Sequence, residues 1–137
     1  MKKRMKMLVA ALLSVFMLMS GITAFASESQ ISPRYSSVNN CEPSFTTSGA
    51  GGVVTVAYYG NDNFARADVT VKVQKRFLLV IWNNVGEWSS SSTNANGYFY
   101  NVFALNGSGT YRATITLTVT GVNGTVDTIT ETIESSY

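Results

Sequence analysis

Few residues of this 137-residue chain have types and spacing suited to chemistry. It contains no histidine, so it lacks an imidazole to act as a general base near neutral pH or to bind a metal. The single cysteine, Cys41, therefore lacks the partner that activates a thiol nucleophile. Two carboxylates suffice to hydrolyse a glycosidic bond, and Glu87 has an aromatic neighbour, Trp88, that could stack on a sugar. Scattered acids reach such a spacing by chance, so we expect no catalytic residue and no enzyme.

Metal and cofactor sites are equally poorly represented. The segment Asn61-Asp62-Asn63 is the densest group of oxygen ligands that calcium could use. It lacks the acidic alternation of a dedicated calcium loop, and we interpret it as a solvated turn. No glycine-rich loop runs into a helix to hold a phosphate. We expect no metal and no cofactor.

The first 26 residues have the pattern of a secretory signal. Basic residues between positions 2 and 6 precede an apolar run over 8–19 and an A-x-A cleavage site at 24–26. About 12 apolar residues are too few for a bilayer core, which needs roughly 20. Cleavage after Ala26 predicts a secreted, extracellular chain. Four of the ten Lys and Arg residues lie in the signal, so the remaining six face eight Asp and Glu, and no basic patch for nucleic acid remains.

The sequence predicts three segments. Residues 1–26 form the signal peptide, residues 27–48 an extended leader with an edge strand around 41–47, and residues 49–137 the folded domain. Cys41 lies in the leader, where it is either a buried apolar residue, a free thiol or part of an intermolecular disulfide. We favour the buried or inert thiol.

A regular alternation of residue types organises the folded domain. From Tyr111 to Thr120 apolar residues take the odd positions and Arg or Thr the even ones, as in a strand with one buried and one wet face. We predict that this is the central strand of a sandwich. Further strands are expected over 53–59, 67–74, 98–105 and 125–133, with turns at 60–63 and 121–124 and a polar loop over 89–97. The predicted inward residues are Val54, Val56, Val69, Val71, Val73, Tyr111, Ala113, Ile115, Leu117 and Val119, and the outward ones are Asp68, Lys72, Arg112, Thr114, Thr116 and Thr118. With almost no helical periodicity, the pattern predicts an all-β, antiparallel β-sandwich of about seven strands.

One stretch resembles a known motif. Gly109-Thr110-Tyr111-Arg112-Ala113 is similar to the tyrosine corner of immunoglobulin-like sandwiches, in which a tyrosine hydroxyl bonds to backbone upstream. Tyr111 matches the tyrosine, whereas Ala113 and Gly107 replace the usual cysteine and aspartate. The whole chain, with its signal and its Ile31–Arg34 leader, also resembles small uncharacterised β-sandwich proteins secreted by Gram-positive bacteria. The resemblance implies an immunoglobulin-like fold and no mechanism.

The segment from Lys75 to Trp82 permits two structures. The strand before it could continue through Trp82 with both faces buried, or it could turn near Lys75-Arg76 and return through 82–88. Length favours a hairpin, since strands usually have about five or six residues, and the resemblance places a hairpin here as well. In a hairpin, Phe77 to Ile81 would form an apolar protrusion beside Lys75 and Arg76, a composition suited to a membrane surface or a partner's groove. The sequence leaves open whether this protrusion instead folds back over the core.

Aromatic and apolar side chains supply the candidate contact surface. Among them, Tyr98 and Tyr100 share one face of a predicted strand. The candidate contact residues are Phe77, Leu78, Leu79, Trp82, Trp88, Tyr98 and Tyr100. We expect a secreted, non-catalytic recognition or adhesion module whose partner is an extracellular protein, a glycan or a membrane surface. The alternatives are an assembly protein that pairs through an exposed sheet edge, and a small membrane-active effector that uses the apolar segment 77–82.

Overall fold

A computed structural model of the chain describes residues 34–137. The predicted signal peptide, its cleavage site and the first part of the leader lie outside these residues. The described part consists of seven strands: β1 (Val38–Ser48), β2 (Gly51–Gly60), β3 (Phe64–Phe77), β4 (Ile81–Ser92), β5 (Asn96–Ala104), β6 (Thr110–Gly121) and β7 (Val126–Ser136). It contains no helix, and therefore none long and apolar enough to span a membrane.

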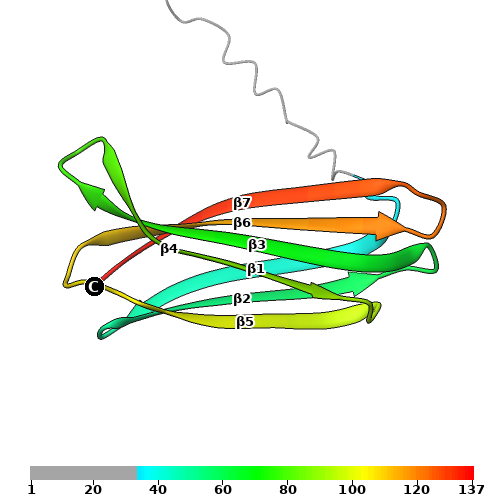
Figure 1. Cartoon of the computed structure of the whole chain (residues 1–137), viewed down its shortest axis with the longest axis horizontal. Helices are drawn as coiled ribbons and strands as arrows, with labels where there is room; N and C mark the ends of the chain where they lie inside the picture. Colours follow the sequence, from blue (N-terminus) through cyan, green and yellow to red (C-terminus); the bar gives the residue numbers. More distant parts are fainter. Residues whose placement is uncertain (1–33) are drawn as a thin grey trace, which may run out of the picture. The chain divides into compact units, whose positions relative to one another are not determined.

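The strands form two sheets that face each other (Figure 1). One sheet has the order β1-β2-β5 and the other β4-β3-β6-β7, and all neighbouring strands are antiparallel. Along one side the backbone N–H of Thr47 in β1 donates to the Ser135 hydroxyl in β7, which joins the sheets. On the other side β4 and β5 have no further strand neighbour within residues 34–137. The predicted all-β antiparallel sandwich of about seven strands is confirmed.

β6 is the central strand that the alternation predicted. It lies between β3 and β7, and its odd residues from Tyr111 to Val119 are at most 2% exposed. Its even residues remain partly exposed. β-Branched residues favour this extended, half-buried surface, so local preference and burial agree along the whole strand.

The core is formed by the inward faces of both sheets. All ten residues predicted to point inward are at most 2% exposed, and the six predicted to point outward are at least partly exposed. The ring of Tyr58 stacks on Phe64 and Phe99 at centroid distances of 5.8 and 5.4 Å. The core also includes Val38, Phe45, Ala67, Phe103, Leu105 and Ile129.

The polar loop predicted over 89–97 is wrong at both ends. Ser89–Ser92 continue β4, where they pair with Ala67–Thr70 of β3, and Asn96 and Gly97 already belong to β5. Serine is a weak strand former, but β3 needs backbone partners along its length. An edge strand can supply these backbone partners while its serine hydroxyls stay near water. Pairing with β3 therefore makes this serine-rich segment a strand despite its composition.

β3 and β4 form a long hairpin, which resolves the two structures left open for 75–82. β3 runs for 14 residues to Phe77 and β4 begins at Ile81, so the hairpin interpretation is correct. The register shifts beyond Val73, where Val85 is an extra residue on β4. Such a bulge bends the strand and increases its twist, and the hairpin beyond it curves away from the sandwich in Figure 1. Its end therefore projects and does not fold back over the core.

Tyr111 stands at the same end of the sandwich. Its hydroxyl donates to the carbonyl oxygens of Asn106 and Gly107, at 2.9 and 2.6 Å, so the backbone contact implied by the tyrosine-corner resemblance is present. Gly107 and Gly109 have φ values of 72° and 143°, which side-chain-bearing residues rarely adopt. Glycine at these positions lets the β5–β6 loop pass beneath the tyrosine ring, on which Tyr137 stacks at 6.0 Å.

At the opposite end a polar network ties the start of the described chain to two turns. Asp127 accepts hydrogen bonds from the backbone N–H groups of Ser36 and Ser37, at 3.1 and 2.6 Å. The Asn63 amide donates to the hydroxyls of Ser37 and Thr125, each at 3.0 Å. In the Asn61-Asp62-Asn63 turn, considered above for calcium, the Asn63 side chain thus forms hydrogen bonds within the protein.

Candidate functional site

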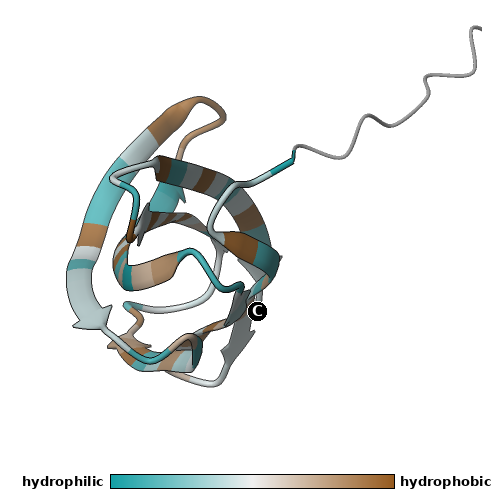
Figure 2. Ribbon diagram, turned by 90° about the vertical axis from the view of Figure 1, so that its right-hand side faces the viewer, coloured by the Kyte–Doolittle hydropathy of each residue, from teal (hydrophilic) through white to brown (hydrophobic). Residues whose placement is uncertain are grey.

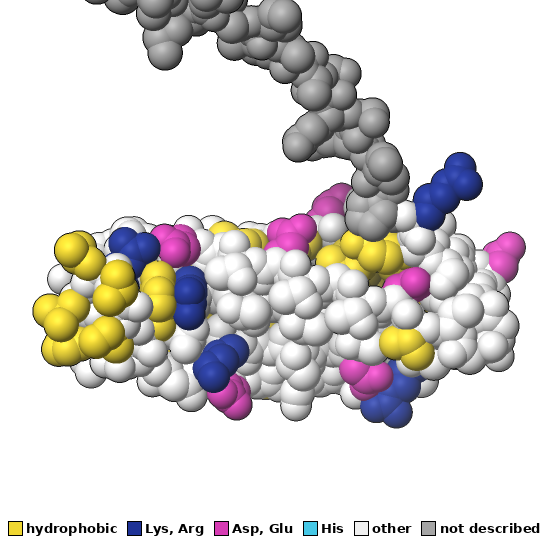
Figure 3. All heavy atoms as spheres, turned by 90° about the horizontal axis from the view of Figure 1, so that it is seen from above, with side chains coloured by type: hydrophobic (Ala, Val, Ile, Leu, Met, Phe, Trp, Pro, Cys, Tyr) yellow, Lys and Arg dark blue, Asp and Glu magenta, His cyan; other side chains and the backbone are white. Residues whose placement is uncertain are grey.

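The β3–β4 hairpin ends in a continuous exposed apolar segment. Phe77–Ile81, which we call the apolar tip, are 55, 69, 89, 81 and 46% exposed in sequence order. The tip is brown at the hairpin end in Figure 2 and forms the yellow cluster at one end of Figure 3. Single exposed apolar residues are ordinary, whereas a contiguous group marks a contact surface.

Leu78 of the apolar tip has a strained backbone. Its φ of 56° is the only positive value at a non-glycine position among the described residues. For an L-residue with a Cβ this left-handed conformation costs roughly 1–2 kcal/mol, which glycine would avoid. The side chain is 69% exposed, so packing within the domain does not offset the strain. Strained residues cluster at functional sites, so Leu78 marks this turn as a candidate contact site.

Three cations lie at the base of the apolar tip; we call Lys75, Arg76 and Arg112 the basic collar. The guanidinium carbons of Arg76 and Arg112 lie 4.9 and 4.1 Å from the centre of the Trp82 ring. Arg76 also forms an ion pair with Glu134 at 2.9 Å. The Lys75 ammonium donates to a backbone carbonyl of the β5–β6 loop. Trp82 is therefore a half-buried residue beneath the tip, with two guanidinium groups over its ring.

A hollow of about 400 Å³ lies beside the hairpin and the β5–β6 loop. Its lining contains two cations and three amide side chains but no carboxylate. The lining residues are Lys75, Arg76, Phe77, Asn83, Asn84, Val85, Ala104 and Asn106. The Lys75 ammonium and the amide groups can donate to an anionic or strongly polar group, whereas Arg76 would have to share its guanidinium with Glu134.

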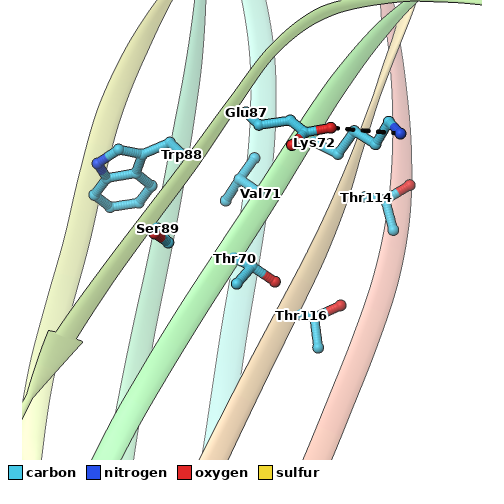
Figure 4. Close-up of a pocket in the computed structure, with 8 residues that line it drawn as sticks. All are labelled: Thr70, Val71, Lys72, Glu87, Trp88, Ser89, Thr114 and Thr116. Atoms are coloured by element: carbon cyan, nitrogen blue, oxygen red, sulfur yellow. Dashed lines mark ion pairs between the residues drawn. The ribbon is translucent and has the colours of Figure 1, made fainter.

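Glu87 and Trp88 do not form the sugar-stacking pair that their adjacency suggested. Successive residues of a strand project to opposite faces, and Figure 4 shows the two side chains diverging from β4. The Glu87 carboxylate lies 3.5 Å from the Lys72 ammonium on the outer face. Trp88 packs against the core and meets Phe99 edge-on at 6.3 Å. Glu87, Trp88 and Lys72 also line a shallow hollow on β3, β4 and β6. The other residues of its lining are Thr70, Val71, Ser89, Thr114 and Thr116.

Tyr98 and Tyr100 form a separate exposed surface. They are 64 and 55% exposed on the outer face of β5, next to Val102 at 50%, while Phe99 between them is buried. β5 belongs to the three-stranded sheet, whereas the apolar tip extends from the four-stranded one. The seven candidate contact residues therefore lie in three places: the tip and its base, the core side of β4, and β5.

Cys41 lies half-buried on β1 against the core. Burial, followed by the charges of Glu131 and Glu42, raises the pKa of its thiol to about 11. The thiol is thus protonated at neutral pH, and only the thiolate is reactive. This geometry favours the inert thiol over a reactive one.

Sequence reasoning found the apolar tip and the adjacent Lys75 and Arg76, but it missed Arg112 as the third member of the basic collar. Arg112 pairs with Gln74, and Trp82 pairs with Arg76, two residues further along β3. The contact between Arg112 and Trp82 thus depends on the register of three strands. The lysine–arginine pair before the apolar run was the only local signal of positive charge here.

Comparisons with known proteins assign this chain to no family. No family model matches the sequence, and no curated protein matches it. A family 76 glycoside hydrolase from a bovine Bacteroides thetaiotaomicron strain is similar in structure over 73% of this chain, with 13% identity and a TM-score of 0.45. OgpA from Akkermansia muciniphila is similar over 72%, with 18% identity and a TM-score of 0.40. This chain spans 20% and 29% of the length of those chains. The strand order itself defines a small, all-β, two-sheet sandwich domain, and no family is assigned.

Proposed function

We propose that this protein is a secreted, non-catalytic recognition module that binds a surface outside the cell through the apolar tip. The observation that carries the proposal is the tip itself, a contiguous apolar segment of which Leu79 is 89% exposed. The signal-like N-terminus supports secretion. The absence of histidine from the sequence supports a role other than acid–base catalysis. The Tyr111 contact and the two-sheet order support an immunoglobulin-like class.

Folding stability does not account for the apolar tip. A fully exposed aliphatic or aromatic side chain forgoes about 1.5–3 kcal/mol of burial energy, and Leu78 adds backbone strain. Polar residues with turn preferences would serve the hairpin better. Contact with a partner would bury the tip and offset both costs.

A matched pair of double variants tests the proposal. Phe77→Ser with Leu79→Ser alters the tip, and Val122→Ser with Val126→Ser alters valines that are 71 and 60% exposed at the opposite end. The purified secreted protein is applied to phospholipid vesicles, glycan arrays and extracellular proteins. On the surface that the wild type binds, the tip variant should lose about ten-fold affinity or more, and the control variant none.

Both variants should melt close to the wild-type temperature, because substitutions at exposed positions change stability by about 0.5 kcal/mol or less. A tip variant that binds every wild-type target unchanged would contradict the proposal. A large fall in its melting temperature would show that the tip is part of the core.

A second candidate function is assembly through a sheet edge, which the outer edge of β5 favours. This edge has no strand neighbour among the described residues, and Tyr98 and Tyr100 beside it are exposed. Such edges pair with strands of other chains. Assembly predicts a concentration-dependent increase in mass by light scattering that Tyr100→Lys reduces; a mass constant at all concentrations would argue against self-assembly.

A further inference from the structure

We infer that the surface contacted by the apolar tip is a phospholipid bilayer with anionic headgroups, an inference that rests on the proposed function. The tip extends over five residues without a side chain that can form a hydrogen bond. Stable protein interfaces involve about 20–30 residues on each side. A short convex apolar segment falls well below that size, whereas insertion into a bilayer requires only that the segment project.

The backbone of the hairpin suits shallow insertion. Phe77 pairs with Ile81 in the β-ladder, so only the turn over 78–80 lies outside the cross-strand pairing. Polar backbone groups without internal partners are excluded from the hydrocarbon core. The apolar tip would therefore lie at the boundary between headgroups and acyl chains, about 5–10 Å deep.

Positive charge is concentrated at the base of the apolar tip. The basic collar contains three cations, and Glu134 is the carboxylate paired with one of them. The next charged groups along the sheet, Lys72 and Glu87, form a neutral pair. Residues 34–137 as a whole contain one more carboxylate than cation, so this end has the opposite sign to the rest. Anionic leaflets attract such clustered cations.

The groups between tip and body fit the headgroup layer. The neighbouring hollow of about 400 Å³ is lined by Lys75, by three amide side chains and by Arg76, whose guanidinium also pairs with Glu134. These donors suit a phosphate group. Trp82 lies where the apolar tip meets the basic collar. Indole rings favour the membrane–water interface. Behind the apolar tip, Trp82 and its cross-strand partner Arg76 thus lie together at the level that the headgroup layer of a bilayer leaflet would occupy.

Vesicle binding tests the inference. The secreted protein is sedimented with vesicles of phosphatidylcholine mixed with phosphatidylglycerol, and with vesicles of phosphatidylcholine alone. We expect binding to the mixed vesicles that weakens with salt. Loss of one collar cation should reduce it roughly five-fold, tested with Lys75→Gln. Phe77→Ser with Leu79→Ser should reduce binding by about ten-fold or more, and Val122→Ser with Val126→Ser should not.

Fluorescence supplies a second measurement that does not depend on a tip variant. In a Trp88→Phe protein, Trp82 is the remaining tryptophan of the sequence, and its emission should shift to the blue when the mixed vesicles are added. A protein that binds neither kind of vesicle, or whose Trp82 emission does not respond, overturns the membrane inference. If the tip variant then loses binding to a glycan or protein, the proposed function stands with a different partner. If it loses nothing, both fail.

Discussion

Replacing Tyr111 by phenylalanine should destabilise the sandwich by about 1–3 kcal/mol, the cost of leaving a buried polar group without its partner. The hydroxyl donates to the carbonyls of Asn106 and Gly107, and the ring is fully buried. The substitution keeps the ring and its stacking on Tyr137, so little packing is lost. For a domain of this size, each kcal/mol lowers the melting temperature by roughly 4–8 °C.

Urea unfolding followed by tryptophan fluorescence measures this loss. The matched control is Tyr100→Phe, whose side chain is 55% exposed and whose unfolding free energy should change by less than about 0.5 kcal/mol. Midpoints are comparable only if the denaturant slope is the same in both variants. Equal midpoints at equal slopes would refute the reasoning that the Tyr111 hydroxyl holds the loop, and with it the proposed immunoglobulin-like class.

Three further predictions concern the core, a close contact and acid stability. Leu117→Ala should cost about 2–5 kcal/mol and Thr116→Ala on the opposite face less than about 0.5 in urea unfolding; equal losses would contradict the register of β6. Gly97→Ala should cost about 1–3 kcal/mol, because its Cβ would lie 2.1 Å from the Tyr58 hydroxyl; an unchanged melting curve would show that the ring moves aside freely. Burial of the Asp127 carboxyl opposes ionisation, yet the hydrogen bonds from two serines lower its pKa; its stabilisation is therefore complete above the unfolded pKa of about 3.9 and lost as pH falls through the lower folded value. Asp127→Asn should flatten that acid-induced fall in stability, and a curve parallel to the wild type would refute this role.

The parts of the fold predicted from sequence are those in which each residue's surroundings repeat along the chain. In β6 every odd residue faces the core and every even residue faces outward, so the pattern could be followed without knowing its neighbours. The same alternation holds in β3 from Ala67 to Val73. The end of β4 could not be predicted this way, because Ser89–Ser92 become a strand through pairing with β3.

In the candidate site, too, the features that follow from local sequence were predicted, and those that depend on strand pairing were not. The apolar tip is a local run of residue types, so the sequence indicated its position. Its projection depends on the bulge at Val85, for which no residue type gave a signal. The contact of Arg112 with Trp82 at 4.1 Å joins strands distant in sequence, and no local pattern reveals such a pair.

The opposite placement of the chain's entry and the apolar tip has a mechanical consequence. The chain enters the sandwich near Ser36, beside the β6–β7 turn. The tip lies at the far end of β3, whose 14 residues at about 3.3 Å each span about 45 Å. Tension between a surface held by the tip and the chain before β1 would run along the strands. Antiparallel hydrogen bonds lie perpendicular to the strands, so this force shears the whole β1–β2 ladder at once and does not open it one bond at a time. A domain pulled in this direction resists extension because many hydrogen bonds bear the force in parallel. The force at which the domain unfolds would be set by the detachment of β1.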